Sequence, residues 1–327
     1  MAAPPLARTA LGAARLCPVS AMNIKSFDCR ALTCAWPMLN GSPAYRYRSS
    51  SYSEEAAVNR TPVVFIHGAW LHALSWESWA ERFASRGFLA FTPGWPGEPL
   101  TVGEMRQSSE TIADVGLDLL TDHYAKIASS FDVAPVIIGH SVGGLIAQHL
   151  IGANIGQAAV AIAPAPVNGI TLPVPPGGLW LPSHAEGGPT AASDPLVSLS
   201  AAQFQHFFAN TVSEEESARL FDRYAVPAPR RLLADLGCAG SARSARAVAD
   251  VGNADRGPLL LISGQEDLLV PDAATRAVYK QYGDSLAVTD LKQFADRAHS
   301  LIIDNGWRFV ADYVLGWLGE HGLRAHP

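Results

Sequence analysis

The sequence predicts an α/β protein with a mostly parallel central sheet flanked by helices and an inserted helical cap. Two observations support this class. Short runs that are apolar throughout, such as VVFI at 63–66 and VII at 136–138, alternate with segments of helical periodicity. This alternation is typical of a parallel sheet covered on both faces. Between residues 165 and 250 the alternation stops, and Pro- and Gly-rich sequence leads into several short helical patterns.

The strands and helices follow one another in a regular order. We expect strands within 61–68, 87–99, 134–141, 158–166, 257–267 and 285–294, and helices over 108–130, 142–154, 272–282 and 305–319. This order predicts a core at 61–164 and 251–320, a cap (lid) insertion at 165–250, an N-terminal extension at 1–60 and a tail at 321–327. In such a sheet the chemistry belongs at the carboxyl ends of the strands.

The composition favours a globular protein with a large buried core. Of the 327 residues, 48% are apolar and 17% are charged, which argues against a disordered chain. The net charge of −6, without a basic stripe, argues against nucleic acid as a partner. No run approaches the roughly 20 apolar residues of a membrane span, and the ten histidines show no zinc-site spacing. We therefore expect no membrane partner, no metal and no cofactor.

The cysteines and the N-terminus indicate the cell compartment. The four cysteines, Cys17, Cys29, Cys34 and Cys238, do not make a disulfide framework in a chain of this length, although a local Cys29–Cys34 bridge stays open. We expect a reduced, cytoplasmic protein. Arginines interrupt the apolar run that a secretory signal needs. An unstructured tail, or a start upstream of a true one at Met22, explains the N-terminus more simply than an organelle presequence.

A serine lies between glycines at an expected turn from a strand to a helix. Residues 139–143 read GHSVG, after an apolar strand and before a helical pattern, which fits the G-x-S-x-G nucleophile elbow. Such a turn needs small neighbours, here Gly139 and Gly143. It also raises the serine hydroxyl beside a helix N-terminus, which favours developing negative charge. A glycine-rich structural turn is the alternative, but the flanking strand and helix favour Ser141 as a nucleophile.

A neutral serine needs a base, and the base needs an acid to orient it. His299, after the last expected strand, is the candidate base. Asp267 follows the fifth expected strand and is the candidate acid, with Glu266 beside it as the competitor. The resulting order Ser, Asp, His along the chain is the one expected for an elbow-type fold.

The oxyanion of an acyl-transfer intermediate needs hydrogen-bond donors. We expect the backbone N–H of Val142, directly after the nucleophile, to be one donor. The second should be the N–H of Ala69, in the turn after the first expected strand. His67 more readily braces that turn by hydrogen bonds than acts as a base.

Four motifs together resemble the α/β-hydrolase fold superfamily. They are HGAW at 67–70, GHSVGG at 139–144, GQEDLLVP at 264–271 and AHSLIIDN at 298–305. The resemblance covers roughly residues 61–318, with a cap after the sixth strand of the full fold. Within the superfamily the chain is similar to serine esterases, lactonases and cofactor-free perhydrolase-type members. Epoxide hydrolases and dehalogenases of this fold carry aspartate where this chain has Ser141, which argues against those reactions. The motif HGAW has a single glycine, so the chain does not resemble the HGGG-type lipases.

The resemblance implies a serine hydrolase that cleaves a carboxylic ester or lactone through an acyl-enzyme intermediate. The aromatic residues of the chain near the candidate site suggest an apolar, aromatic or bulky cyclic small-molecule substrate. We expect Trp70, Trp180, Phe207 and His206 in the substrate pocket, with core or cap packing as the alternative for each. Cofactor-free lyase or perhydrolase chemistry at the same triad, and ligand binding without catalysis, stay open. The N-terminal arm is compatible with a contact in a homo-oligomer.

Overall fold

The computed structural model describes residues 60–167, 169–170, 172, 194–237, 244 and 246–323. Its centre is a six-stranded sheet of order β2-β1-β3-β4-β7-β8, in which every pairing is parallel. The strands are β1 (Pro62–Ile66), β2 (Leu89–Phe91), β3 (Val136–His140), β4 (Ala158–Ile162), β7 (Leu259–Gly264) and β8 (Thr289–Phe294). The sheet confirms the expected α/β class with a mostly parallel sheet.

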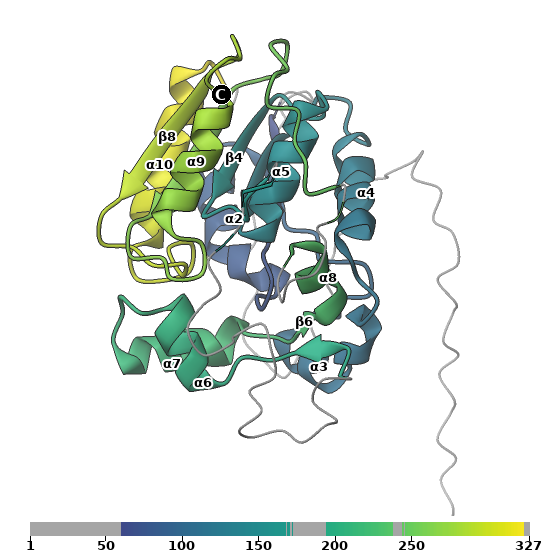
Figure 1. Ribbon diagram of the computed structural model, residues 1–327, viewed down its shortest axis with the longest axis vertical. Helices are drawn as coiled ribbons and strands as arrows, with labels where there is room; N and C mark the ends of the chain where they lie inside the picture. Colours follow the sequence, from purple (N-terminus) through teal and green to yellow (C-terminus); the bar gives the residue numbers. More distant parts are fainter. Residues whose placement is uncertain are drawn as a thin grey trace, which may run out of the picture. The chain divides into compact units, whose positions relative to one another are not determined.

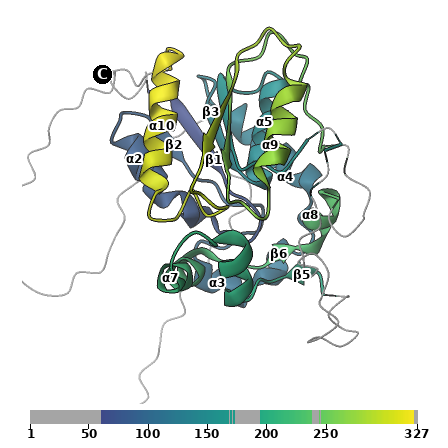
Figure 2. The same cartoon turned by 60° about the vertical axis from the view of Figure 1, so that its left-hand side comes forward.

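Helices cover both faces of this sheet. They are α2 (Glu77–Ala84), α4 (Leu117–Ala128), α5 (Val142–Gly152), α9 (Asp272–Gln281) and α10 (Trp307–Glu320). Figure 2 shows α2 and α10 on one face and α4, α5 and α9 on the other. Strands β1, β3, β4 and β7 are buried along their whole length, as strands between two helical layers must be. Among the described residues, none of the helices combines the length and the apolar character that crossing a membrane requires.

The expected helix over 108–130 was wrong in its first part. The chain instead forms α3 (Val102–Gln107), a 3-10 turn at Ser109–Ile112, and α4, which begins at Leu117. Gly116 is extended there, with φ −120° and ψ 174°. The Leu117 N–H donates to the carboxylate of Asp235 at 2.8 Å. Because a distant residue caps α4, its start could not be predicted from local periodicity.

The chain leaves the sheet between β4 and β7. The described part of this segment contains β5 (Leu196–Val197), α6 (Ala201–Gln203), a π-helical turn (Phe204–Phe208), α7 (Glu214–Tyr224), β6 (Ala228–Pro229) and α8 (Arg230–Asp235). Strands β5 and β6 pair antiparallel, a feature that the sequence did not reveal. Figures 1 and 2 both place α6 and α7 beyond one end of the sheet. The Ser300 N–H, in the loop after β8, donates to the Phe208 carbonyl at 2.9 Å, so this end is the carboxyl end of the strands.

Candidate active site

Ser141 lies in a sharp turn between a strand and a helix. Strand β3 ends at His140, and α5 begins at Val142. Ser141 itself has φ 55° and ψ −115°, and a positive φ is uncommon for a residue with a Cβ. The Ser141 N–H donates to the Ile162 carbonyl at 2.9 Å, which ties the turn to β4. Strain of this kind persists only where the surrounding structure holds it, and it is often found at functional sites.

Glycines let three pieces of backbone meet around this serine. A Cβ on Gly139 would overlap the Gly143 carbonyl, and a Cβ on Gly143 would overlap the carbonyl of Ile66 at the end of β1. A Cβ on Gly68 would lie 2.7 Å from the Ser141 Cβ. These glycines are therefore required by the close packing of the turn against β1 and the loop that follows β1.

His299 and Asp267 come together from the loops after β8 and β7. The distance from His299 Nδ1 to Asp267 Oδ2 is 2.7 Å, and both side chains are buried. The other carboxylate oxygen, Oδ1, accepts the N–H groups of Leu269 and Val270, each at 2.8 Å. An ionised carboxylate only accepts hydrogen bonds, so the proton of the neutral imidazole is on Nδ1 and Nε2 carries a lone pair. Glu266, the competing acid, has an exposed side chain.

Two further residues, His140 and Phe208, contact His299. The His140 ring donates from Nε2 to the His299 carbonyl at 2.9 Å, and the two rings are 4.5 Å apart. Burial holds the pKa of His140 well below its usual range, so His140 is neutral. The Phe208 ring meets His299 edge-on at 4.8 Å. His140 precedes the candidate nucleophile directly, which is the only sequence signal for it.

Ser141 and His299 line one cavity. Its other described walls are Ala69, Trp70, Val142, Ala165, Leu172, Leu233, Leu236, Leu269 and Val270. The cavity volume is about 20 Å³, which is room for about one water molecule. Apart from the serine and the histidine, the residues of this wall are apolar. A polar substrate group would therefore find few partners away from the reacting atoms.

The expected pocket residues divide into three cases. Trp70 lines the cavity. Phe207 is buried and His206 is exposed, and neither belongs to the described wall. Trp180 lies outside the described residues.

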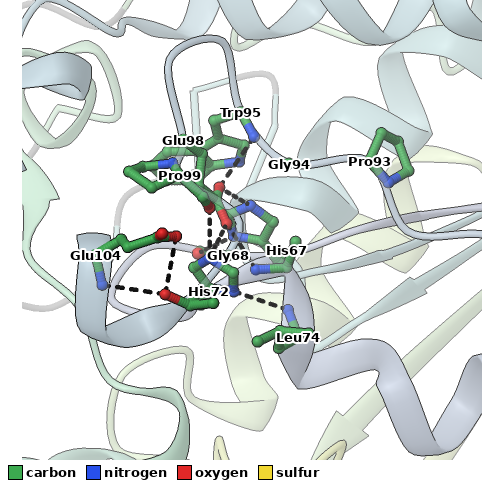
Figure 3. Close-up of polar contacts among 12 residues, drawn as sticks. His67, Gly68, His72, Leu74, Pro93, Gly94, Trp95, Glu98, Pro99 and Glu104 are labelled. Atoms are coloured by element: carbon green, nitrogen blue, oxygen red, sulfur yellow. Dashed lines mark hydrogen bonds and ion pairs between the residues drawn. The ribbon is translucent and has the colours of Figure 1, made fainter. Parts of the chain in front are cut away.

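Both expected oxyanion donors border the cavity. Val142 is the first residue of α5, so its N–H has no acceptor within the helix. Ala69 follows β1 and precedes Trp70, whose φ of 63° turns the chain sharply. His67 is held in a buried cluster with Glu98 and His72 (Figure 3). Within the described ranges, no group of three or more His, Cys, Asp or Glu residues is placed to hold a metal ion.

The chain is similar to known proteins over most of its length. The profile of the Alpha/beta hydrolase family matches residues 63–313. One similar solved structure is a methylesterase protein, MES16, from Arabidopsis, with 17% sequence identity and a TM-score of 0.54. The match covers 80% of this chain and 99% of that chain. A monoacylglycerol lipase from Paleococcus ferrophilus has 19% identity, coverage of 80% and 97%, and a TM-score of 0.55. A thermophilic esterase from Thermogutta terrifontis has 16% identity, coverage of 80% and 91%, and a TM-score of 0.53. These identities show a shared fold alone, and no curated protein matches the chain.

Proposed function

Because the chain belongs to the Alpha/beta hydrolase family, we propose that it is a serine hydrolase that cleaves a carboxylic ester or lactone through an acyl-enzyme intermediate. The observation that carries the proposal is the cavity shared by Ser141 and His299, with His299 Nδ1 hydrogen-bonded to Asp267 at 2.7 Å. Nucleophile, base and orienting acid are the three groups that such a reaction needs. Their positions at the ends of β3, β8 and β7 fit the elbow-type fold.

In the first half of the proposed reaction, His299 Nε2 takes the proton of the Ser141 hydroxyl as the serine oxygen attacks the carbonyl carbon. The N–H groups of Ala69 and Val142 stabilise the negative charge that develops on the carbonyl oxygen. His299 then gives its proton to the alcohol oxygen, and the bond between that oxygen and the carbonyl carbon breaks. Asp267 stays ionised and stabilises the imidazolium form of His299 in both steps.

In the second half, His299 removes a proton from water, and the resulting hydroxide attacks the acyl-enzyme. Collapse of this second intermediate releases the acid and returns the proton to Ser141. With a lactone, the alcohol and the acid are the two ends of one product. Each bond made and broken involves only the substrate, water and the chain's own residues.

We propose an apolar acyl group for the substrate. The wall formed by Leu233, Leu236, Leu269 and Val270 offers no hydrogen-bonding side chain, and burial of apolar surface is worth about 25 cal/mol per Å². Leu233 and Leu236 belong to the segment inserted between β4 and β7, so we further propose that this segment is the cap of the site. Two structural neighbours are described as a methylesterase and an esterase, which makes esters the first class to test.

The test is hydrolysis of chromogenic short-chain esters and a lactone panel by the wild type and by Ser141→Ala. We expect turnover by the wild type and no turnover above background by the variant, with an unchanged circular dichroism spectrum. Equal rates for the two proteins would show that the serine assignment is wrong. A mass increase of the wild type with a fluorophosphonate probe, absent in the variant, gives a readout that needs no substrate.

A further inference from the structure

Glu98 is a buried carboxylate that the proposed catalytic steps do not use. It lies in the loop after β2, and its side chain is only 3% exposed. Its Oε1 accepts the Ala73 N–H at 2.8 Å, and its Oε2 accepts the Trp95 N–H at 2.9 Å. Two imidazoles complete its surroundings, with His67 Nε2 at 2.9 Å from Oε2 and His72 Nε2 at 3.2 Å from Oε1 (Figure 3).

The hydrogen bonds of His72 define a neutral ring. Its Nδ1 accepts the Leu74 N–H at 3.1 Å, so this nitrogen carries no proton. The proton is therefore on Nε2, which lies 2.9 Å from the Pro99 carbonyl and 3.2 Å from Glu98. Nε2 therefore donates to the Pro99 carbonyl, and its 3.2 Å separation from Glu98 is a close approach and not a hydrogen bond. His72 thus contributes no charge to the cluster.

The surroundings of His67 differ in one respect. Its Nδ1 lies 3.1 Å from the Gly68 carbonyl, and its Nε2 lies 2.9 Å from the Glu98 carboxylate. Both partners can only accept, and a neutral imidazole has only one N–H. The Nε2 contact has an ion-pair distance but is not aligned as a hydrogen bond. The imidazolium is the form in which both contacts are attractive. The His67 ring also stacks on Trp95 with centres 4.6 Å apart and planes 18° apart, and an indole face favours a cation.

The state of Glu98 agrees with a charged partner. Burial alone would raise the pKa of Glu98, but the charge of His67 and the hydrogen bond from the Ala73 N–H outweigh burial and lower the pKa to about 2. Glu98 is therefore ionised at neutral pH. A buried carboxylate needs a compensating charge and hydrogen bonds to remain so, and His67 and the two backbone N–H groups supply them.

The cluster adjoins the site of acyl transfer. Gly68, bonded to His67 through the chain, lies so close to Ser141 that an added Cβ would be 2.7 Å from the Ser141 Cβ. Ala69, the proposed oxyanion donor, comes next. Glu98 holds this turn at both ends, through the side chain of His67 and through the N–H of Ala73.

We propose that Glu98 is a positioning residue of the oxyanion site, which holds His67 as an imidazolium and thereby fixes the turn that carries the Ala69 N–H. This role rests on the proposed hydrolase function. Because the Glu98 carboxylate compensates the charge of His67 at 2.9 Å, the pair acts on the oxyanion site by fixing the position of the turn and not by a net charge. Its effect should be felt in the transition state more than in substrate binding.

The protonation of His67 can be measured without any substrate. We would record two-bond ¹H–¹⁵N correlation spectra of the full chain labelled with ¹⁵N-histidine at pH 7.5, and assign the His67 signals by their loss in His67→Gln. The expected result is two protonated ring nitrogens for His67 in the wild type and one in Glu98→Gln. A single protonated nitrogen in the wild type would overturn the inference while leaving the hydrolase proposal intact.

Kinetics test the positioning role itself. We expect Glu98→Gln and His67→Gln to lower kcat by about 10- to 100-fold with KM changed less than about twofold, since a misplaced donor costs transition-state stabilisation. His72→Gln, which leaves the ion pair in place, should lower kcat less than about threefold, a weaker hydrogen-bond effect. The matched control is Glu104→Gln, because Glu104 is exposed on α3 and bonds only near the start of that helix.

The outcomes separate the possible explanations. Equal losses of kcat in His67→Gln and His72→Gln would show that general packing, not the charge, matters, and would refute the proposal. If Glu98→Gln fails to fold, the comparison of those two histidine variants and the wild-type spectrum still decide the question. If Ser141→Ala is as active as the wild type, the hydrolase proposal fails, and the spectrum alone then reports on the His67–Glu98 pair.

Discussion

Gly143→Ala is the most direct test of why glycine stands beside the candidate nucleophile. An alanine Cβ there would lie 2.7 Å from the carbonyl carbon of Ile66 and closer still to its oxygen. Ordinary contacts between carbon atoms are about 3.5–4.0 Å, so α5 and β1 would have to separate by roughly 1 Å. Both elements belong to the buried core, and such cores are too densely packed to absorb that shift freely.

The displacement should affect catalysis more than stability. Overpacking of a core costs about 1–3 kcal/mol, which would lower the melting temperature without unfolding the protein. The same shift would move the Val142 N–H and the Ser141 hydroxyl, and a misplacement of about 1 Å can cost about 100-fold in rate. We therefore expect kcat/KM for a short-chain ester to fall by about 100-fold, mainly through kcat.

The assay is steady-state ester hydrolysis together with thermal unfolding followed by circular dichroism. The matched control is Gly316→Ala on α10, where an added Cβ meets nothing within 4 Å. That control should keep full activity and gain up to about 1 kcal/mol, because glycine is unfavourable inside a helix. If kcat/KM of Gly143→Ala stays within threefold of the wild type, the activation free energy has changed by less than about 0.7 kcal/mol. That result would refute the steric reasoning.

Three further expectations follow from the same structure. Asp267→Asn should lower kcat by about 10⁴-fold through loss of the correct His299 tautomer, whereas Glu266→Gln should change it little; a larger loss with Glu266→Gln in ester hydrolysis would reverse the assignment. Leu233→Ala should shift the preferred acyl chain to longer esters, and an unchanged chain-length profile would remove this residue from the acyl wall. Since the pKa of Glu98 is lowered from 4.5 to about 2, its ionised form stabilises the fold by on the order of 3 kcal/mol above pH 4.5. That stabilisation should be lost as the pH falls towards 2, and equal acid-unfolding curves for the wild type and Glu98→Gln would contradict it.

The sheet could be predicted from sequence because its strands are apolar throughout. Strands such as β3 and β7 are buried on both sides, so local composition reports directly on their environment. Strand β8 is only partly buried, but it could still be predicted because it follows a helix in the regular alternation of strands and helices. The start of α4 was missed because it depends on Asp235, more than 100 residues away along the chain.

The candidate site was likewise only partly predictable from the sequence. Ser141 was detectable because its neighbours must be small, which leaves a mark in the sequence. The choice between Asp267 and Glu266 depended on which carboxylate turns inwards. The structure turns Asp267 inwards, where its Oδ1 accepts the N–H groups of Leu269 and Val270. Glu98 could not be found in this way, because its partners His67, His72 and Ala73 come from a different loop. A single glutamate after a glycine also has no distinctive pattern.

The inserted segment is joined to each of the loops that carry the candidate site. The Tyr224 carbonyl accepts the His72 N–H at 3.1 Å, beside the oxyanion turn. The Asn210 side chain donates to the Glu266 carbonyl at 2.9 Å, next to the candidate acid Asp267. The Phe208 carbonyl accepts the N–H of Ser300, next to the candidate base His299. A segment that only covered the pocket would not need these bonds. Substitutions in this segment should therefore change kcat through the geometry of the site as well as KM through the pocket, which separates its role from that of a simple lid.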